Sequence, residues 1–488
     1  MNASGATRIA LAAGGTGGHM VPAHVLAGEL RERGHEVLLL TDRRGAAVPG
    51  LFEDVRTHIL ESGRMTGNAM MKLGASVRIL MNTRRARRIL KDEAPAALVG
   101  FGGYPSLAAG LAATAIGVPL CLHEQNAVLG RANRLLAKTC RALALSWTGT
   151  ARVPGDAVSR AVVTGNPVRE TVARLADAGY AAPEAAGPIH LLVVGGSLGA
   201  RILSDVVPDA LALLPPALRS RLRVTQQCRR EDLERVLARY RTADIDGELA
   251  PYFTDLPERL GNCHLAIARA GASTIAELAT AGRPAILVPL AIATDDHQSA
   301  NARVLAEAGA AWIMPEDGFD ARALAKRLHR LLADSEGLCS AAAAARRLGS
   351  ADAASRLADL VERIAGVAAT SPARRSGKNE SASASDASSG SSSRVRNWSP
   401  FETGPWPSSG RTEQTGPFGL SLSKSEQGRP PFETGPWPSS GPTEKSKPVR
   451  PEPVEGRAAG NAPFVSCSSK GEWDDRTTMF ALAGEVPA

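Results

Sequence analysis

The chain has 488 residues, 44% of them hydrophobic and 22% charged, which is ordinary for a globular protein and long enough for two or three domains. Its formal net charge of +8 would suit a nucleic acid or an anionic membrane, but basic residues spread over a whole chain say less than a local cluster, and we expect no nucleic-acid partner. The six cysteines lack zinc-ligand spacing and a small disulfide framework, which indicates a reducing cytosol.

The first residues are interpreted as a strand rather than a leader. No basic segment precedes an apolar stretch of signal-peptide length, and the apolar residues 8–13 run directly into a glycine loop. No stretch reaches the roughly 18 uninterrupted apolar residues that a membrane-spanning helix needs. We therefore expect any membrane contact to be peripheral.

Residues 1–165 alternate short apolar runs with helical segments, a pattern typical of βαβ units and a parallel sheet. A helix is predicted over residues 20–33, where Gly34 ends it. The predicted strands cover residues 8–13, 36–41, 96–100, 118–123 and 143–146. We interpret this part as one doubly wound, Rossmann-like domain of the α/β class.

A glycine loop, GGTGGH at residues 14–19, follows the first strand and opens the first helix. Glycines allow a tight turn with exposed N–H groups, and a helix N-terminus stabilises negative charge, so this loop could hold a phosphate or a developing oxyanion. It is neither a dinucleotide fingerprint, because Met20 stands where glycine is needed, nor a P-loop. The plainer alternative is a tight turn without a ligand.

His19 lies in the first turn of that helix, where the helix dipole favours a neutral imidazole that can accept a proton. It is a candidate general base, and the alternative is a histidine that caps the helix or positions a ligand. Residues 100–104 (GFGGY) and 123–126 (HEQN) also follow strands. Because the carboxyl ends of parallel strands meet at one edge of a sheet, we expect both segments to line an acceptor site.

A second set of alternating elements begins near Pro188. Its strands are predicted over residues 190–194, 223–226, 265–268 and 285–289. Like the first set, it opens with a strand, a glycine turn (GGSLGA, 195–200) and a helix. Two such domains place the carboxyl ends of two sheets across a cleft, where open α/β sheets bind ligands. We place the second domain at residues 166–366, with TGNPVR (164–169) as the expected hinge.

The segment RAGASTIAE, residues 269–277, follows a strand of this second domain. Its glycine, small residues and hydroxyls suit a helix N-terminus that faces a diphosphate. Glu277 lies three residues after Thr274 and could be the far half of a capping box. The interpretation that we favour is a carboxylate that accepts both ribose hydroxyls.

Two acidic segments could suggest a metal. Residues 295–298 (DDHQ) lie in one short loop without a partner cluster, so we predict no metal site there. Residues 244–246 (DID) resemble the metal-binding DxD of single-domain glycosyltransferases but lack the matching architecture. We expect neither a metal nor another cofactor.

The composition changes abruptly after about Gly366 to serine, glycine, proline and charged residues. Such a segment buries too little apolar surface to offset its ordering entropy, so residues 367–488 are predicted to be a disordered tail. The decamer FETGPWPSSG occurs twice in it, at 401–410 and 432–441. A recognition motif is one interpretation of this repeat, and an appendage without a catalytic role is the one that we favour.

Together these motifs resemble one family, the bacterial peptidoglycan glycosyltransferases of the MurG type. They occur in family order over residues 8 to about 365, and the tail lies outside the resemblance. The matching stretches are GGTGGH at 14–19, GFGGYPS at 100–106, HEQNAVLGRAN at 123–133, GNPVR at 165–169, GGSLGAR at 195–201, GASTIAEL at 271–278 and DHQSANA at 296–302.

The resemblance implies a GT-B fold and an inverting transfer of N-acetylglucosamine from UDP-N-acetylglucosamine, without a bound metal, to the C4 hydroxyl of a lipid-linked N-acetylmuramyl-pentapeptide. It implies a peripheral enzyme on the cytoplasmic face of the inner membrane. His19 is the candidate base and Glu124 the alternative. The implied donor contacts are Thr16, Gly17, Gly18, Asn126, Arg169, Ser197, Thr254 near the uracil, Ala272, Ser273, Thr274, Ile275, Ala276, Glu277 on the ribose and Gln298 near the phosphates.

A lipid acceptor requires membrane contact, and residues 70–91 hold the local basic cluster. Met70, Met71, Lys72 and Leu73 open an apolar stretch that continues with Val77, Ile79, Leu80 and Met81 and leads to Arg84, Arg85, Arg87, Arg88 and Lys91. Apolar residues beside arginines suit an amphipathic segment on an anionic leaflet. The alternative is a solvated helix face whose other side packs into the core.

Two other functions are compatible with these patterns. One is a different GT-B transferase that acts on a glycolipid or a natural product. The other is a non-catalytic nucleotide-sugar-binding or cell-division scaffold protein, for which the tail could be the interaction arm.

Overall fold

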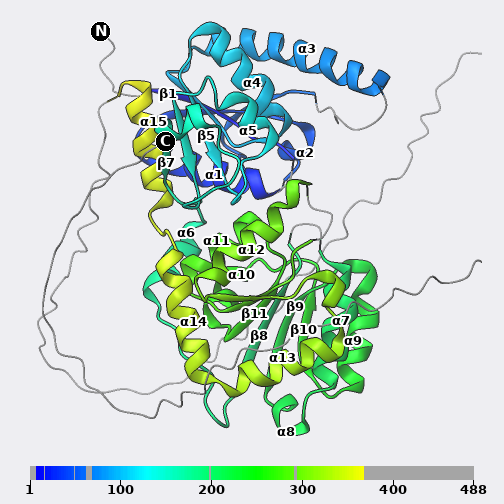
Figure 1. Cartoon of the computed structure of the whole chain (residues 1–488). Helices are drawn as coiled ribbons and strands as arrows, with labels where there is room; N and C mark the ends of the chain where they lie inside the picture. Colours follow the sequence, from blue (N-terminus) through cyan, green and yellow to red (C-terminus); the bar gives the residue numbers. More distant parts are fainter. Residues whose placement is uncertain are drawn as a thin grey trace, which may run out of the picture. The chain divides into compact units, whose positions relative to one another are not determined.

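The computed structural model describes residues 7–15, 17–48, 50–61, 69–196, 199–290 and 294–367. Within them the chain forms two parallel β-sheets with helices on both faces (Figure 1). This arrangement confirms the predicted α/β class with two Rossmann-like domains. The repeated decamers of the predicted tail lie outside the described residues. We call the elements from β1 to β7 the first lobe and those from β8 to α14 the second lobe.

Among the described residues the first sheet has seven strands in the order β3-β2-β1-β4-β5-β6-β7. The strands are β1 (Arg8–Ala12), β2 (Glu36–Thr41), β3 (Arg56–Ile59), β4 (Ala97–Gly100), β5 (Leu120–Glu124), β6 (Ala142–Leu145) and β7 (Ala161–Val163). Its helices are α1 (Gly17–Glu32), α2 (Arg43–Ala46), α3 (Ala69–Glu93), α4 (Gly103–Ile116) and α5 (Arg131–Leu136), with a 3-10 turn at Gly155–Arg160.

The second sheet has six described strands in the order β10-β9-β8-β11-β12-β13. The strands are β8 (Ile189–Val194), β9 (Leu222–Gln227), β10 (Asp246–Ala250), β11 (Leu265–Ala268), β12 (Ala285–Leu287) and β13 (Ala311–Ile313). The helices of this half are α6 (Glu170–Ala173), α7 (Arg201–Ala212), α8 (Pro216–Arg219), α9 (Leu233–Thr242), α10 (Leu256–Asn262), α11 (Ala272–Ala281), α12 (His297–Glu307), α13 (Ala321–Ala333) and α14 (Ser335–Leu348). One more helix, α15 (Ala353–Ala365), follows them in the chain.

Both sheets reverse their strand order beside a central strand. In the first sheet the chain runs outward from β1 and returns to β4 on its other side, and in the second it does the same at β8 and β11. In open α/β sheets ligands bind outside the carboxyl ends of the strands at such a reversal. The loops that leave these four strands carry the predicted segments GGTGGH, GFGGY, GGSLGA and RAGAST.

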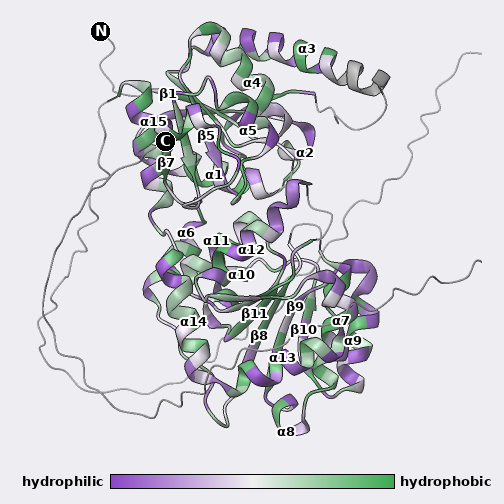
Figure 2. Ribbon diagram, in the orientation of Figure 1, coloured by the Kyte–Doolittle hydropathy of each residue, from purple (hydrophilic) through white to green (hydrophobic). Residues whose placement is uncertain are grey.

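The central strands are short apolar runs because parallel strands are buried on both faces. RIALA in β1 and LAIA in β11 are almost wholly inaccessible, and Figure 2 shows hydrophobic residues along the strands of the second sheet. The four strands that sequence analysis misses, β3, β7, β10 and β13, are the edges of the two sheets. Two of them, RTHI in β3 and DGELA in β10, are half polar because an edge strand is covered less completely. The other two, AVV in β7 and AWI in β13, are apolar but only three residues long, so they lack the longer apolar run that marks the centre.

The last helix, α15, packs on the first lobe although the sequence prediction assigns its residues to the second domain. Leu357, Leu360 and Val361 join the core cluster that contains β1 and α1 (Figure 1). A buried polar cluster accompanies them: Arg33 Nη1 donates to Glu362 at 2.9 Å, and His35 Nε2 lies 2.8 Å from the same carboxylate. Helix α15 therefore packs against residues that precede it by more than 300 positions in the chain.

The described helices include none that is both long enough and apolar enough to cross a membrane.

Candidate active site

Two glycine loops of the first lobe pack against each other at the carboxyl ends of β1 and β4. A Cβ on Gly14 would lie 2.5 Å from Cγ of Pro105, and one on Gly103 would lie 3.1 Å from the carbonyl oxygen of Gly14. Gly103 also has a φ of +79°, which favours glycine. The close approach explains why Gly14 and Gly103 are glycines and brings residues 14–19 and 100–104 together.

The imidazole of His19 lies beside both loops. Its Nδ1 is 3.0 Å from the carbonyl oxygen of Gly14, and because that oxygen can only accept, Nδ1 carries the proton. In the neutral ring Nε2 then keeps a free lone pair, and this atom faces Gly102, where a Cβ would lie 3.4 Å away. The bond to a carbonyl oxygen is not a helix cap, which would accept from a helix N–H.

Asp42, which sequence analysis misses, fixes the first glycine loop. It follows β2 and is fully buried. Its Oδ1 accepts from the backbone N–H of Gly15 at 3.2 Å and from that of Gly45 at 2.8 Å. Asp42 directly follows a predicted strand, β2, which pairs with β1, so the loops after these two strands lie side by side. A carboxylate at the end of that neighbouring strand is the signal that could have found it.

The HEQN segment ends β5 with side chains that bond mainly to one another. His123 is fully buried, and burial lowers the pKa of its ring to about 4, so the ring is neutral at pH 7. Its Nε2 lies 3.1 Å from the carbonyl oxygen of Gly165, and Gln125 Nε2 donates to its Nδ1 at 2.9 Å. His123 therefore ties the end of β5 to the predicted hinge.

The carboxylate of Glu124 is 2% exposed and accepts four hydrogen bonds. Oε1 accepts from the backbone N–H and the side chain of Asn126, and Oε2 accepts from the N–H of Gly130 and the side chain of Asn133 at 2.8 and 2.9 Å. All four donors belong to the loop between β5 and α5 or to α5 itself. The geometry gives Glu124 the role of shaping the loop between β5 and α5.

Two buried polar atoms of α11 have no hydrogen-bond partner among the described residues. They are Oγ of Ser273, in the first turn, and Oε1 of Glu277, one turn further on. Burial raises the pKa of Glu277, while Arg169, whose Nη2 lies 3.8 Å from Oε1, opposes that rise. The N-cap of α11 is Gly271, so Thr274 is the third helical residue and the capping-box alternative for Glu277 is wrong.

Asn301 of α12 joins the two lobes. Its side chain is fully buried, accepts from the N–H of Ala127 at 2.8 Å and donates to Oδ1 of Asn126 at 3.1 Å and to the carbonyl oxygen of Ala270 at 3.0 Å. Gln298, one turn earlier, accepts from the N–H of Leu290 at 3.0 Å. The HEQN loop, the RAGAST loop and the start of α12 thus meet at one place.

The other predicted site residues are placed as follows. Gly17 and Gly18 open α1, and Ala272, Ile275 and Ala276 are buried in α11 beside Thr274. Thr254 is exposed in the loop between β10 and α10. Thr16 and Ser197 lie outside the described residues.

Acidic and metal-ligating side chains do not gather into a metal-like cluster in the described part of the chain. Of the DID triplet, Asp246 begins β10 and pairs with Arg223. The triplet therefore belongs to an edge strand and its neighbouring turn.

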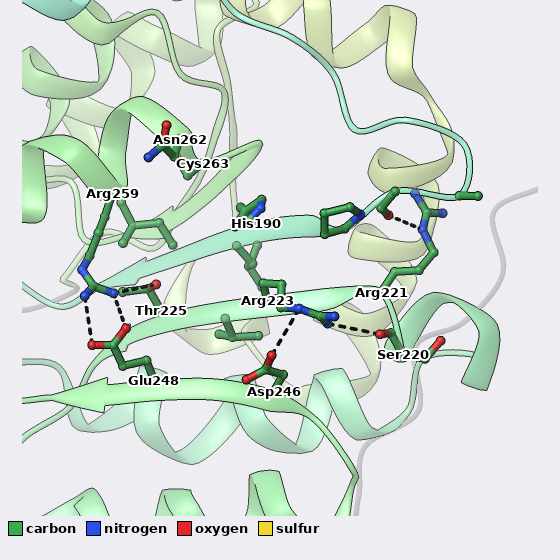
Figure 3. Close-up of a pocket in the computed structure, with 16 residues that line it drawn as sticks. His190, Ser220, Arg221, Arg223, Thr225, Asp246, Glu248, Arg259, Asn262 and Cys263 are labelled. Atoms are coloured by element: carbon green, nitrogen blue, oxygen red, sulfur yellow. Dashed lines mark hydrogen bonds and ion pairs between the residues drawn. The ribbon is translucent and has the colours of Figure 1, made fainter. Parts of the chain in front are cut away.

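A hollow of about 870 Å³ lies at the opposite end of the second sheet, toward the amino-terminal ends of β8, β9 and β10 (Figure 3). Two of its arginines are paired within it, Arg223 with Asp246 and Arg259 with Glu248, and Arg221 donates to backbone carbonyl oxygens. Parallel sheets bind ligands at the carboxyl ends of their strands. We therefore do not assign the active site to this hollow.

Two family models match the two lobes: the glycosyltransferase family 28 N-terminal domain over residues 9–145 and its C-terminal domain over residues 190–360. A relative from Rhodospirillum centenum is 50% identical over 359 residues, which are 74% of this chain and 95% of the relative. It is named UDP-N-acetylglucosamine--N-acetylmuramyl-(pentapeptide) pyrophosphoryl-undecaprenol N-acetylglucosamine transferase. The chain belongs to this family, the MurG glycosyltransferases.

Further MurG relatives agree. One from Granulibacter bethesdensis with the same name is 51% identical over 358 residues, 72% of this chain and 93% of the relative. The crystal structure of Acinetobacter baumannii MurG superposes on this chain with a TM-score of 0.59 at 31% sequence identity. The match covers 73% of this chain and 99% of the Acinetobacter baumannii chain. The MurG resemblance and the GT-B fold are thus confirmed.

Proposed function

We propose that the chain transfers N-acetylglucosamine from UDP-N-acetylglucosamine to the C4 hydroxyl of undecaprenyl-pyrophosphoryl-N-acetylmuramyl-pentapeptide. The observation that carries this proposal is the buried carboxylate of Glu277, whose Oε1 has no hydrogen-bond partner among the described residues. A buried acceptor without a partner is costly unless a ligand supplies the donor. The two hydroxyls of a ribose are such donors, and α11 begins at the strand reversal of the second sheet.

The donor diphosphate fits the same end of α11. Ser273 Oγ can donate to a phosphate oxygen, the first-turn N–H groups of α11 lack partners within the helix, and Arg169 adds a positive charge 3.8 Å from Glu277. Gln298 and Asn126 adjoin this place through Asn301. Thr16, Gly17, Gly18 and Ser197 complete the proposed donor contacts from the two glycine loops.

His19 is the proposed general base. Its Nε2 takes the proton from the acceptor hydroxyl while the hydroxyl oxygen forms the new bond to C1 of the sugar. The bond from C1 to the diphosphate oxygen breaks, and its electron pair leaves with UDP. Oriented N–H groups at helix starts stabilise the departing charge. Glu124, with four hydrogen bonds, shapes the loop between β5 and α5, which carries the proposed donor contact Asn126.

The decisive assay is transfer of radiolabel from UDP-N-acetylglucosamine to the lipid-linked acceptor by the full chain. We expect labelled lipid with an inverted, β-linked sugar. Labelling with another UDP-sugar, or of another glycolipid, but not with this pair would favour a different GT-B transferase. UDP binding without any transfer would favour a non-catalytic scaffold.

Replacing Glu277 by glutamine should raise the KM for the donor about 10- to 100-fold with a smaller change in kcat. The amide keeps the shape but loses the charge and one acceptor atom, and hydrogen bonds to a charged group are worth about 1.5–3 kcal/mol. UDP calorimetry should show the same loss. Glu307→Gln, at an exposed position at the end of α12, is the matched control. Equal donor affinity in the two variants would refute the ribose role.

We also propose that helix α3 rests on an anionic membrane surface, so that the enzyme is peripheral to the cytoplasmic face of the inner membrane. The structure describes the side chains of α3 from Ser76 onward. Val77, Leu80 and Met81 are at least half exposed, whereas Ala86 and Leu90 are buried in the core. Arg84, Arg85, Arg87 and Arg88 are all exposed on the following turns. Apolar side chains beside arginines favour insertion at an anionic interface.

Reversing the charge of these four arginines should lower binding to vesicles that contain anionic lipid at least tenfold, because each basic residue near such a surface contributes about 1 kcal/mol. Binding of the unaltered protein should weaken as salt rises. The matched control reverses Arg322, Lys326, Arg327 and Arg330 on α13 of the second lobe. If both quadruple variants sediment with vesicles like the unaltered chain, α3 is only a solvated helix.

A further inference from the structure

One carboxylate of the second lobe contacts three arginines of the first. Asp295, just before α12, accepts from Arg152 Nη1 at 2.7 Å, from Arg131 Nε at 3.1 Å and from Arg134 Nη2 at 3.1 Å. Arg131 and Arg134 lie on α5, and Arg152 lies between β6 and the next 3-10 turn. The Asp295 side chain is 16% exposed, so its three partners largely enclose it.

The backbone on both sides of this contact is strained. Asp295 has a φ of +56° and Arg152 one of +63°. Aspartate adopts this left-handed conformation at small cost, but arginine rarely does. Such strain persists where surrounding interactions hold it, and it concentrates at functional sites. Here the ion pair joins the two strained residues directly.

The contact lies between two parts of the proposed donor site. On the second lobe Asp295 lies two residues before the start of α12, which carries Gln298 and the buried Asn301. On the first lobe α5 follows the loop that Glu124 organises. The hydrogen bonds of Asn301 to the loop after β5 form one connection between these two parts. The ion pairs of Asp295 form a second connection.

We propose that Asp295 is a positioning residue for the transfer reaction: its three ion pairs hold the start of α12 against the first lobe and thereby set the affinity for the nucleotide-sugar donor. This inference rests on the proposed function. Asp295 does not touch the reacting atoms, so its loss lowers the fraction of enzyme in the donor-binding arrangement. The apparent dissociation constant rises as that fraction falls.

The kinetic test compares Asp295→Asn with Asp244→Asn. Asparagine tolerates positive φ, and Asp244 is an exposed aspartate with a φ of +52° far from α12, so the control matches both the charge change and the backbone. We expect Asp295→Asn to raise the donor KM about five- to tenfold with kcat changed less than twofold. The difference from the unaltered enzyme should shrink as salt rises. A fall in kcat at constant KM, or no change in either, would overturn the proposal.

A double-mutant cycle with Arg152→Asn asks whether the effect passes through this contact. If it does, the double variant is no worse than the poorer single variant, whereas independent sites would multiply their effects. Hydrogen exchange on the substrate-free chain supplies a readout that does not depend on the reaction. Both single variants should exchange faster over residues 126–134 and 297–302, and Asp244→Asn should not. If hydrogen exchange in these two segments were unchanged in both single variants, the proposed role of the Asp295 ion pairs would be overturned, whether or not the chain shows transfer activity. If exchange were faster but the chain showed no transfer activity, only the proposed function would be contradicted.

Discussion

Replacement of His19 by alanine is expected to lower kcat by about 10²- to 10⁴-fold, the usual contribution of a general base. The structure gives the reason: Nδ1 is committed to the carbonyl oxygen of Gly14, so Nε2 is the free basic atom beside both glycine loops. UDP affinity should stay within a few-fold, because the proposed donor contacts of α11 are untouched. The measurement is steady-state kinetics together with UDP calorimetry.

The control for this variant is His329→Ala, an exposed histidine on α13. It should retain full activity. If His19→Ala turned over as fast as the unaltered enzyme, another group would have to accept the proton. If it lost UDP affinity and turnover equally, His19 would be a ligand-positioning residue, the alternative left open by the sequence.

Replacement of Arg33 by methionine is expected to destabilise the protein by about 3–5 kcal/mol, since it removes the guanidinium of a buried ion pair. The side chains of Arg33 and Glu362 are 1% and 0% exposed, and the pair joins α1 to α15. Denaturant unfolding of the first lobe should show the loss. Arg56→Met removes a surface pair with Glu93 and should cost at most about 1 kcal/mol.

Restoring neutrality gives a second test of the same pair. The double variant Arg33→Met, Glu362→Gln should recover part of the stability, because the fully buried charge of Glu362 is then removed and the other two carboxylates that pair with Arg33, those of Glu29 and Asp359, are partly exposed. A loss below about 1 kcal/mol for Arg33→Met alone would show that α15 is held mainly by its apolar stripe.

The centre of each sheet was predictable from the sequence because parallel strands are buried on both faces and become apolar runs between glycine turns. RIALA and LAIA carry that signal, and the loops after them proved to lie at the two strand reversals. The edge strands RTHI and DGELA are half polar and were missed for the same physical reason. The family resemblance, which rests on loop motifs, was confirmed by the comparisons.

What the sequence could not supply are partners far apart in the chain. Nothing near Glu362 indicates that it pairs with Arg33, and nothing near Asp295 indicates three arginines more than 140 residues away. The difference between Glu124 and Glu277 also could not be predicted from the sequence, because it lies in the hydrogen bonds that each side chain makes in the folded chain. Both are buried glutamates in matching motifs, but one accepts four hydrogen bonds and the other keeps an oxygen without a hydrogen-bond partner among the described residues.

The most direct test of the central claim is a crystal structure of this chain with bound UDP. The account predicts ribose hydroxyls about 2.7 Å from the carboxylate of Glu277 and the diphosphate at the first turn of α11. UDP bound in the hollow between Arg223 and Arg259, or anywhere away from the start of α11, would contradict it.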